Sequence, residues 1–309
     1  MRNKKKKISI VVPVFNEEGI LAELYEHLAS VTSKRTEEFE IIFVNDGSSD
    51  GTIDILLGLR QKDNRVCVID FARNFGHQNS ICAGLAESEG DAVILMDADM
   101  EDRPDDILKF LEYWDKGYEV VYAIRKKRNV SWLKTLLFKF FHKLNKHISS
   151  INMDATGTFG LMDRRVVSEI VRLKEQNRYM PGLRSWVGFK QIGIEIDRGS
   201  RYDDSPRVRP LQLYKLAFDS FTSFSASLLA LPMIVGVIFF IVSIGSLFVI
   251  LLLKIFFNIG PWGWTSLMSI ILFISGIQFA FIGLLGEYIS RIMEEVKGRP
   301  LYIIRDKYK

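Results

Sequence analysis

Short apolar runs alternate with helical patterns through the first half of the chain. Five runs rich in β-branched residues predict strands, at 8–14, 39–44, 66–71, 92–96 and 118–124. Helical patterns fall between them, at 20–31, 52–60, 78–87 and 104–116. This order predicts βαβ units and an α/β fold with a mostly parallel sheet. Because the runs show little apolar–polar alternation, we expect strands that are buried on both faces.

The second half of the chain contains two long stretches without any charged residue. No charge occurs between Asp219 and Lys254, and none occurs between Lys254 and Glu287. Each stretch exceeds the roughly 20 apolar residues that cross a bilayer. We therefore expect two transmembrane helices, 228–253 and 262–286, joined by a short turn; a pair of buried core helices is the alternative.

Basic residues set the expected orientation of these two helices. The turn between the helices carries only Lys254. Four basic residues precede the first helix, namely Arg201, Arg207, Arg209 and Lys215, and six follow the second, namely Arg291, Lys297, Arg299, Arg305, Lys307 and Lys309. Basic flanks favour the cytoplasmic side. The pattern predicts an inner-membrane protein whose first part, residues 1–209, and whose C-terminal tail, residues 287–309, both face the cytoplasm.

Two further segments are expected near the membrane. In residues 132–148 apolar side chains recur every four positions beside a border of lysines. This pattern is typical of a helix lying in the membrane interface, and an amphipathic helix packed on the sheet is the alternative. Residues 210–227 are expected to form a second amphipathic helix that leads into the first membrane helix.

Overall composition changes this picture little, at 48% hydrophobic and 25% charged residues with a net charge of +4. Cys67 and Cys82 have no CxxC spacing, so neither a disulfide nor a zinc site is expected. The histidines lack a metal-binding spacing and are expected to be ordinary helix or loop residues: His27, His77, His142 and His147. The basic residues follow the membrane boundary, which gives no support to nucleic-acid binding.

Polar residues follow four of the predicted strands, at 16–18, 45–52, 73–76 and 97–99. Ligands of open α/β sheets gather beyond the carboxyl ends of the strands, so these segments predict a polar cleft. Asp97 and Asp99, separated by one residue, suit Mg²⁺ or Mn²⁺ shared with substrate phosphates, although a solvated turn is the alternative. Asp46 stands where a carboxylate could accept a hydrogen bond from a nucleobase, or it belongs to a turn before a helix N-cap.

Four segments lie at or just after the ends of predicted strands, in order along the chain: Val12-Pro13-Val14-Phe15-Asn16-Glu17, Val44-Asn45-Asp46-Gly47-Ser48, Arg73-Asn74-Phe75-Gly76 and Asp97-Ala98-Asp99. In order and spacing they resemble family 2 glycosyltransferases of the GT-A fold, which have a Rossmann-like sheet. Segments 161–164, 178–188, 286–288 and 299–302 resemble the bactoprenol glucosyltransferase and dolichyl-phosphate mannose synthase group. The resemblance covers nearly the whole chain. It implies a nucleotide-sugar donor (a UDP-hexose), a polyprenyl phosphate acceptor and a homo-oligomer.

The resemblance also implies roles for individual residues. Asp97 and Asp99 would flank the sugar diphosphate, with Asp99 as the expected direct metal ligand. The remaining donor-binding residues would be Pro13, Phe15, Glu17, Asp46, Arg73, Asn74, Ala98 and Arg125. Residues 125–128 are alternatively a solvated basic run. Trp186 would lie on the acceptor side, with core packing as its alternative, and the lipid phosphate would be held by Arg178, Arg201 and Arg207.

The chain departs from the family pattern at the expected catalytic base. Thr158 stands where relatives commonly carry an aspartate, and Pro206-Arg207 replaces a Ser-Lys pair. A phosphate monoester, with a second pKa of about 6, arrives largely ionised and needs no base. The expected reaction is therefore a direct, inverting attack, with Asp154 or Asp163 as an alternative base. Two rival functions are transfer to a sugar hydroxyl and nucleotide-sugar binding without catalysis.

Overall fold

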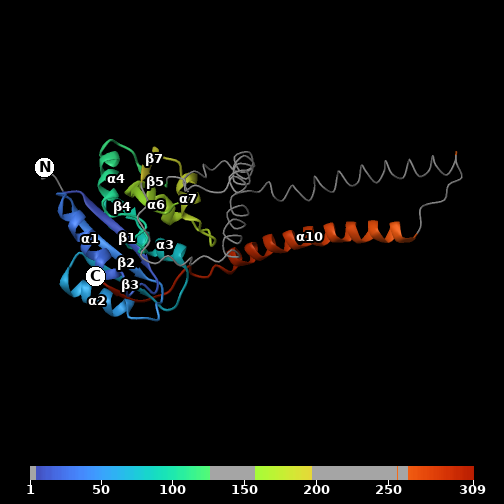
Figure 1. Cartoon of the computed structure of the whole chain (residues 1–309), viewed down its shortest axis with the longest axis horizontal. Helices are drawn as coiled ribbons and strands as arrows, with labels where there is room; N and C mark the ends of the chain where they lie inside the picture. The colour runs from blue at the N-terminus through green and yellow to red at the C-terminus, as the bar shows by residue number, and fades with distance from the viewer. Residues whose placement is uncertain (1–4, 126–156, 197–255, 257–263) are drawn as a thin grey trace. The chain divides into compact units, whose positions relative to one another are not determined.

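The structure is a computed structural model that describes residues 5–125, 157–196, 256 and 264–309 (Figure 1). The chain divides into one unit of Met1–Arg209 with Pro300–Lys309 and a second unit of Pro210–Arg299. Several predictions lie outside the described residues, namely the helices 132–148, 210–227 and 228–253 and the side chains of Asp154, Arg201 and Arg207.

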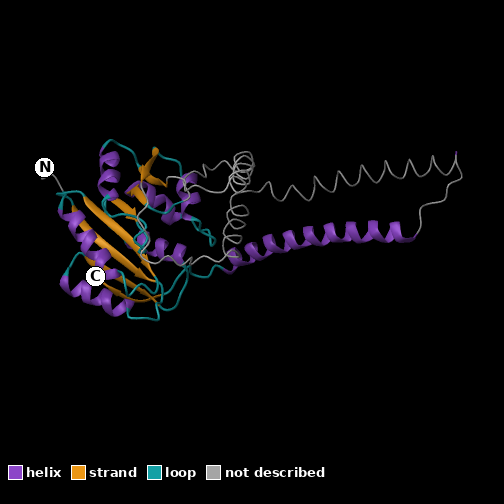
Figure 2. Ribbon diagram, in the orientation of Figure 1, coloured by secondary structure: helices purple, strands orange, loops and turns teal. Residues whose placement is uncertain are grey.

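The apolar runs of the sequence form the parallel centre of an eight-stranded sheet with the order β7-β5-β6-β4-β1-β2-β3-β8 (Figure 2). The four central strands are parallel neighbours: β4 (Ala92–Leu95), β1 (Lys7–Val14), β2 (Glu38–Asn45) and β3 (Val66–Phe71). Flanking strands are β5 (Val120–Arg125), β6 (Gly160–Asp163), β7 (Gln191–Ile196) and β8 (Ile304–Tyr308). β6 and β8 pair antiparallel with their neighbours. The expected α/β fold is confirmed, with a mixed rather than mostly parallel sheet.

Helices cover both faces of this sheet, which explains why the central strands are apolar without alternation. On one face, a buried core joins the strands to α1 (Leu21–Ser33), α2 (Thr52–Lys62) and α4 (Asp106–Asp115). On the other face, the core includes α3 (His77–Glu87), α6 (Arg164–Arg172) and α7 (Met180–Trp186). Along β1, Ile10 and Val12 enter the first core and Val11 the second, as the two-residue period of a strand requires.

A glycine brings α3 close to the centre of the sheet. A Cβ atom added at Gly84 would lie 2.2 Å from Cγ1 of Val11 in β1, so only glycine permits this approach. The close packing fixes α3 against β1 and β2. It therefore fixes the first turn of α3, which begins at His77, relative to the carboxyl ends of these strands.

The second unit is represented by α10 (Trp264–Lys297), a helix of 34 residues. The charge-free stretch predicts a membrane helix at 262–286, and α10 covers most of that range and continues to Lys297. Its exposed apolar side chains include Leu267, Ile270, Ile271, Ile274, Ile282, Leu285, Ile289, Ile292, Met293 and Val296. Within the described residues, no helix combines the length and apolarity that a membrane crossing requires. The segment 287–309, expected as a tail, ends α10 and supplies β8 of the sheet.

Candidate active site

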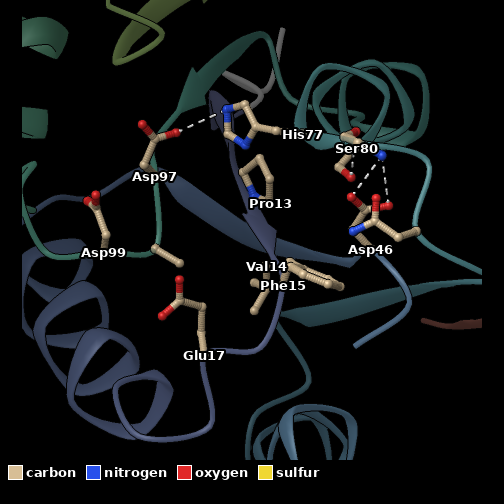
Figure 3. A pocket seen from close by; sticks show the side chains of 12 residues that line it. Pro13, Val14, Phe15, Glu17, Asp46, His77, Ser80, Asp97 and Asp99 are labelled. Atoms are coloured by element: carbon tan, nitrogen blue, oxygen red, sulfur yellow. Dashed lines mark hydrogen bonds and ion pairs between the residues drawn. The ribbon is translucent and has the colours of Figure 1, made fainter. Parts of the chain in front are cut away.

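A pocket of about 410 Å³ lies where the four central strands end (Figure 3). Its walls come from the end of β1, the end of β2, the turn between β3 and α3 with the first turn of that helix, and the end of β4. The lining residues are Pro13, Val14, Phe15, Glu17, Asp46, Asn74, Gly76, His77, Ser80, Asp97, Ala98 and Asp99. A volume of this size is within the usual range for small-molecule sites, about 300–1,000 Å³.

The loops after β1 and β2 are joined by reciprocal hydrogen bonds. The backbone amide of Asn16 donates to Oγ of Ser48 at 2.9 Å, and Oδ1 of Asn16 accepts from the amide of Ser49 at 2.8 Å. Asn16 itself has a φ of 55°, a left-handed conformation that asparagine tolerates better than most residues. The amide of Glu17 also donates to Oγ1 of Thr52 at 3.0 Å. These bonds fix the rim of the pocket on which Phe15 and Glu17 stand.

Asp46 organises the third loop of the pocket. The residue is only 3% exposed, and its carboxylate accepts hydrogen bonds from the backbone amides of Phe75 at 2.7 Å and Gly76 at 2.9 Å. Burial raises the pKa of the Asp46 carboxyl above its ordinary value, and the two amides oppose that shift. Gly47 follows with a φ of 65°, and a Cβ there would lie 2.5 Å from the carbonyl carbon of Arg73. The loops after β2 and β3 are thus closely packed.

Asp97 and Asp99 lie together at the end of β4. Oδ1 of Asp97 is 3.4 Å from Nε2 of His77, and both of its oxygens accept from the hydroxyl of Thr158 at 3.2 and 3.3 Å. Oδ1 of Asp99 accepts from the amide of Glu101 at 3.1 Å. Figure 3 shows Asp97, Asp99 and Glu17 on one side of the pocket and Asp46 on the other.

The charges of the lining bear on the kind of ligand the pocket can hold. Four lining residues are acidic, and no described lining residue is a lysine or arginine. Such a wall would repel the diphosphate of a nucleotide sugar unless a cation lay between them. The paired carboxylate oxygens of Asp97 and Asp99 suit Mg²⁺ or Mn²⁺. The described residues contain no group of three or more His, Cys, Asp or Glu arranged to hold a metal ion. Mg²⁺ is commonly bound in proteins by one or two carboxylates together with substrate phosphates and water.

His77 and Ser80 line the pocket, although neither was among the predicted site residues. The histidine was expected to be an ordinary helix or loop residue. Its position was the available signal, because it directly follows the segment 73–76 at the end of β3. A side chain in the first turn of a helix that starts at a strand end faces the same edge of the sheet as the strand ends do.

Other predicted site residues lie outside the pocket lining. The register of β4 and β6 sets Asp163 opposite Ala92, at the amino end of β4, while Asp97 follows the carboxyl end. The Asp163 carboxylate caps α6 through the amide of Arg165 and accepts from Nε1 of Trp114 at 2.9 Å. This placement does not support Asp163 as a base in the pocket.

The remaining predicted arginines and the tryptophan are placed as follows. The guanidinium of Arg73 lies 4.4 Å from the ring centroid of Phe75, outside the lining. Arg178 donates to the backbone carbonyls of Leu173 and Glu175, and so closes the end of α6. Trp186, at the end of α7, is 62% exposed and therefore is not a core residue. Arg125 is the last residue of β5.

The sequence family described as Glycosyl transferase family 2 matches residues 9–171, which contain every lining residue of the pocket. The chain belongs to this family. YkcC of Bacillus subtilis (strain 168), described as an uncharacterized glycosyltransferase, is 43% identical over 97% of this chain and 94% of that protein. The enzyme activity of the chain is therefore glycosyl transfer.

Two further glycosyltransferases are similar along almost their entire lengths. The SfII prophage-derived bactoprenol glucosyl transferase of Shigella flexneri is 38% identical over 98% of this chain and 99% of that protein. The prophage bactoprenol glucosyl transferase homolog of Escherichia coli (strain K12) is 38% identical over 97% of this chain and 98% of that protein. The predicted resemblance to this group of glycosyltransferases is confirmed. Similarity at this coverage includes the second unit as well as the catalytic one.

Proposed function

We propose that this glycosyltransferase moves a hexose from a UDP-sugar to the phosphate of a polyprenyl lipid, with Mg²⁺ or Mn²⁺ bound at Asp97 and Asp99. The observation that carries the proposal is the similarity to bactoprenol glucosyl transferases over 98% of the chain. The names of those relatives include bactoprenol, a polyprenyl lipid. The sequence similarity continues through the charge-free stretches of the second unit. The acidic lining of the pocket also supports a bound cation, because a diphosphate could not lie beside these carboxylates without one.

The reaction exchanges one bond at the anomeric carbon of the sugar. The bond to the diphosphate oxygen breaks, and its electron pair leaves with the nucleoside diphosphate. An oxygen of the lipid phosphate forms the new bond from the opposite face, which inverts the configuration. A divalent cation would neutralise the charge that develops on the leaving diphosphate. Within the chain, the Asp97 and Asp99 carboxylates would hold that cation, and the loops after β1, β2 and β3 would position the nucleoside.

Thr158 supports a phosphate acceptor rather than a hydroxyl acceptor. Its hydroxyl donates to Asp97 and cannot remove a proton at neutral pH. A sugar hydroxyl would need a base at this point, whereas a phosphate monoester is already largely dianionic above its second pKa of about 6. The described residues lining the pocket leave Glu17, Asp46, Asp97 and Asp99 as its carboxylates. We assign these carboxylates to donor and cation binding. None of them has to act as a base, because the phosphate acceptor is already ionised.

A lipid acceptor requires attachment to a membrane, and we propose that the second unit supplies it. Two transmembrane helices at 228–253 and 262–286 would account for the absence of charge in those stretches. Apolar side chains such as Ile270, Ile282 and Leu285 are exposed on α10, and apolar surface of this extent is normally covered by lipid or protein. The enzyme would be a homo-oligomer of the inner membrane with its catalytic unit in the cytoplasm. Arg201 and Arg207 would then hold the lipid phosphate beside the membrane.

The test combines purified protein with Mg²⁺ or Mn²⁺ and a panel of UDP- and GDP-hexoses. One set of reactions contains polyprenyl phosphate, and a matched set contains a polyprenyl-linked sugar with free hydroxyls. We expect a polyprenyl-phosphate hexose from one UDP-hexose and no product in the second set. Product in the second set alone would instead establish transfer to a sugar hydroxyl. No product in either set would contradict the proposal.

A further inference from the structure

The last residues of the chain return to the catalytic unit and pack beside the donor pocket. β8 pairs antiparallel with β3, with Tyr308 opposite Val68 and Asp306 opposite Asp70. The amide of Ala72, just past the end of β3, donates to the carbonyl of Ile303 at 3.0 Å. The chain after Ala72 forms the loop 73–76, which holds Asp46. The C-terminal segment thus borders the loop at its base.

Aromatic rings connect the C-terminal segment to this loop. The ring of Tyr302 stacks on Phe71 with centroids 5.1 Å apart and an interplanar angle of 7°. Phe71 in turn meets Phe75 edge to face at 5.7 Å. Phe75 is the residue whose amide donates to the Asp46 carboxylate at 2.7 Å. Three rings in contact therefore run from the C-terminus to the pocket wall.

A second set of contacts reaches the same wall through polar groups. The guanidinium of Arg305 lies 3.4 Å from Oδ2 of Asp70 and donates to the carbonyl of Ala72 at 2.9 Å. Asp70 is 4% exposed, and its Oδ1 accepts from Nδ2 of Asn45 at 2.7 Å. Asn45 directly precedes Asp46 in the chain. Arg305 thus compensates the buried charge that holds the end of β2 in place.

We propose that Tyr302 and Arg305 are positioning residues for the nucleotide donor, acting through the loop 73–76 and Asp46. They contact neither the pocket nor the reacting atoms. They restrict the loop to the conformation in which its amides donate to the Asp46 carboxylate. The free-energy cost of ordering the loop is then not subtracted from the binding free energy of the nucleotide. The role rests on the proposed function, because it requires that the pocket bind a nucleotide.

The test measures binding of UDP with Mn²⁺ to the whole chain in detergent, and the donor KM and kcat of transfer. For Tyr302→Ala and Arg305→Gln we expect the dissociation constant and KM to rise by about tenfold, the equivalent of about 1.4 kcal/mol. We expect kcat at saturating donor to stay within about twofold, since the groups around the anomeric carbon are unchanged. Tyr302→Phe keeps the stacked ring and should bind as the wild type does.

Lys309→Gln is the matched control, because Lys309 follows the same strand but pairs with Glu89 at 3.2 Å, away from the loop. It should leave the dissociation constant unchanged. A merely structural role would lower the melting temperature and kcat of Tyr302→Ala and Arg305→Gln without changing the dissociation constant, which would overturn the inference. Wild-type protein that binds no nucleotide would remove the proposed function, and this role with it.

Discussion

The hydroxyl of Thr158 donates to both carboxylate oxygens of Asp97, at 3.2 and 3.3 Å. An aspartate at position 158, as the family resemblance leads one to expect, would set a second negative charge against Asp97. The threonine supplies a hydrogen-bond donor instead. It thereby holds the Asp97 carboxylate in one orientation while leaving the charge of that carboxylate available to a cation.

Replacing Thr158 with valine should therefore weaken cation binding. A hydrogen bond to a charged group contributes about 1.5 kcal/mol, so the Mn²⁺ concentration for half-maximal rate should rise by about tenfold. Thr158→Ser retains the hydroxyl and should remain within about threefold of the wild type, a difference well below the loss of a whole hydrogen bond. Initial rates across a Mn²⁺ titration measure both. Equal Mn²⁺ dependence in all three proteins would show that the bond has no such role.

Gly47→Ala should damage the pocket through its backbone. The new Cβ would meet the carbonyl carbon of Arg73 at 2.5 Å, and φ of 65° is unfavourable for alanine. We expect a loss of about 1–3 kcal/mol of stability together with weaker nucleotide binding.

Gly58→Ala provides the comparison for this change. Nothing lies within 4 Å of a Cβ at Gly58 in α2, so the substitution should stabilise that helix by about 0.5–1 kcal/mol. Thermal unfolding of both variants, with and without UDP, separates the two effects. Gly47→Ala with wild-type melting temperature and affinity would be inconsistent with the close packing of these loops.

The stability of the catalytic unit should depend on pH through Asp63. The guanidinium of Arg65 lowers the pKa of the Asp63 carboxyl, burial opposes this, and the Arg65 amide and Tyr25 hydroxyl add to the lowering. The contribution is complete above the pKa of an unfolded aspartate, about 3.9, and is lost as the pH falls through the lower folded value.

Thermal unfolding of wild type and Asp63→Asn should therefore differ most near neutral pH and converge on acidification. Asp105→Asn is the control, since the Asp105 side chain forms an exposed pair with Lys34 at 3.4 Å. It should match the wild type at every pH, as exposed pairs contribute little. A difference between wild type and Asp63→Asn that stayed constant down to about pH 3, below the ordinary aspartate pKa, would contradict this account.

The central strands and helices were predictable because burial on two faces leaves a strong apolar signal. β3 occupies the predicted residues. β1 and β4 differ from their predicted ranges by one residue at one end, and β2 is longer by one residue at each end. The strands at the sides of the sheet gave weaker signals. β6 has four residues and begins with glycine, and β8, with the sequence IRDKY, is polar because it is an edge strand with exposed residues. Polar edge strands resemble loops and tails in sequence.

The site was predictable where residues follow a strand directly. Glu17, Asp46, Asp97 and Asp99 line one pocket because the parallel strands before them end at one edge of the sheet. His77 was missed because a single histidine has no spacing to mark it. Asp163 was a candidate base, but β6 runs antiparallel to β4. This direction, which the sequence did not reveal, places Asp163 beside the amino end of β4, at the edge of the sheet opposite the pocket.

The rate of sugar transfer to polyprenyl phosphate by Asp99→Asn shows whether this pocket is the site of glycosyl transfer. The comparison protein is Asp91→Asn, because Asp91 is an exposed aspartate at the opposite end of β4 that accepts from the amide of Lys7 at 2.8 Å. With the whole chain in vesicles and Mn²⁺ present, Asp99→Asn should lose about 100-fold or more of the wild-type rate, and Asp91→Asn should retain it. Transfer by Asp99→Asn at the wild-type rate would contradict the assignment of this pocket as the site of glycosyl transfer.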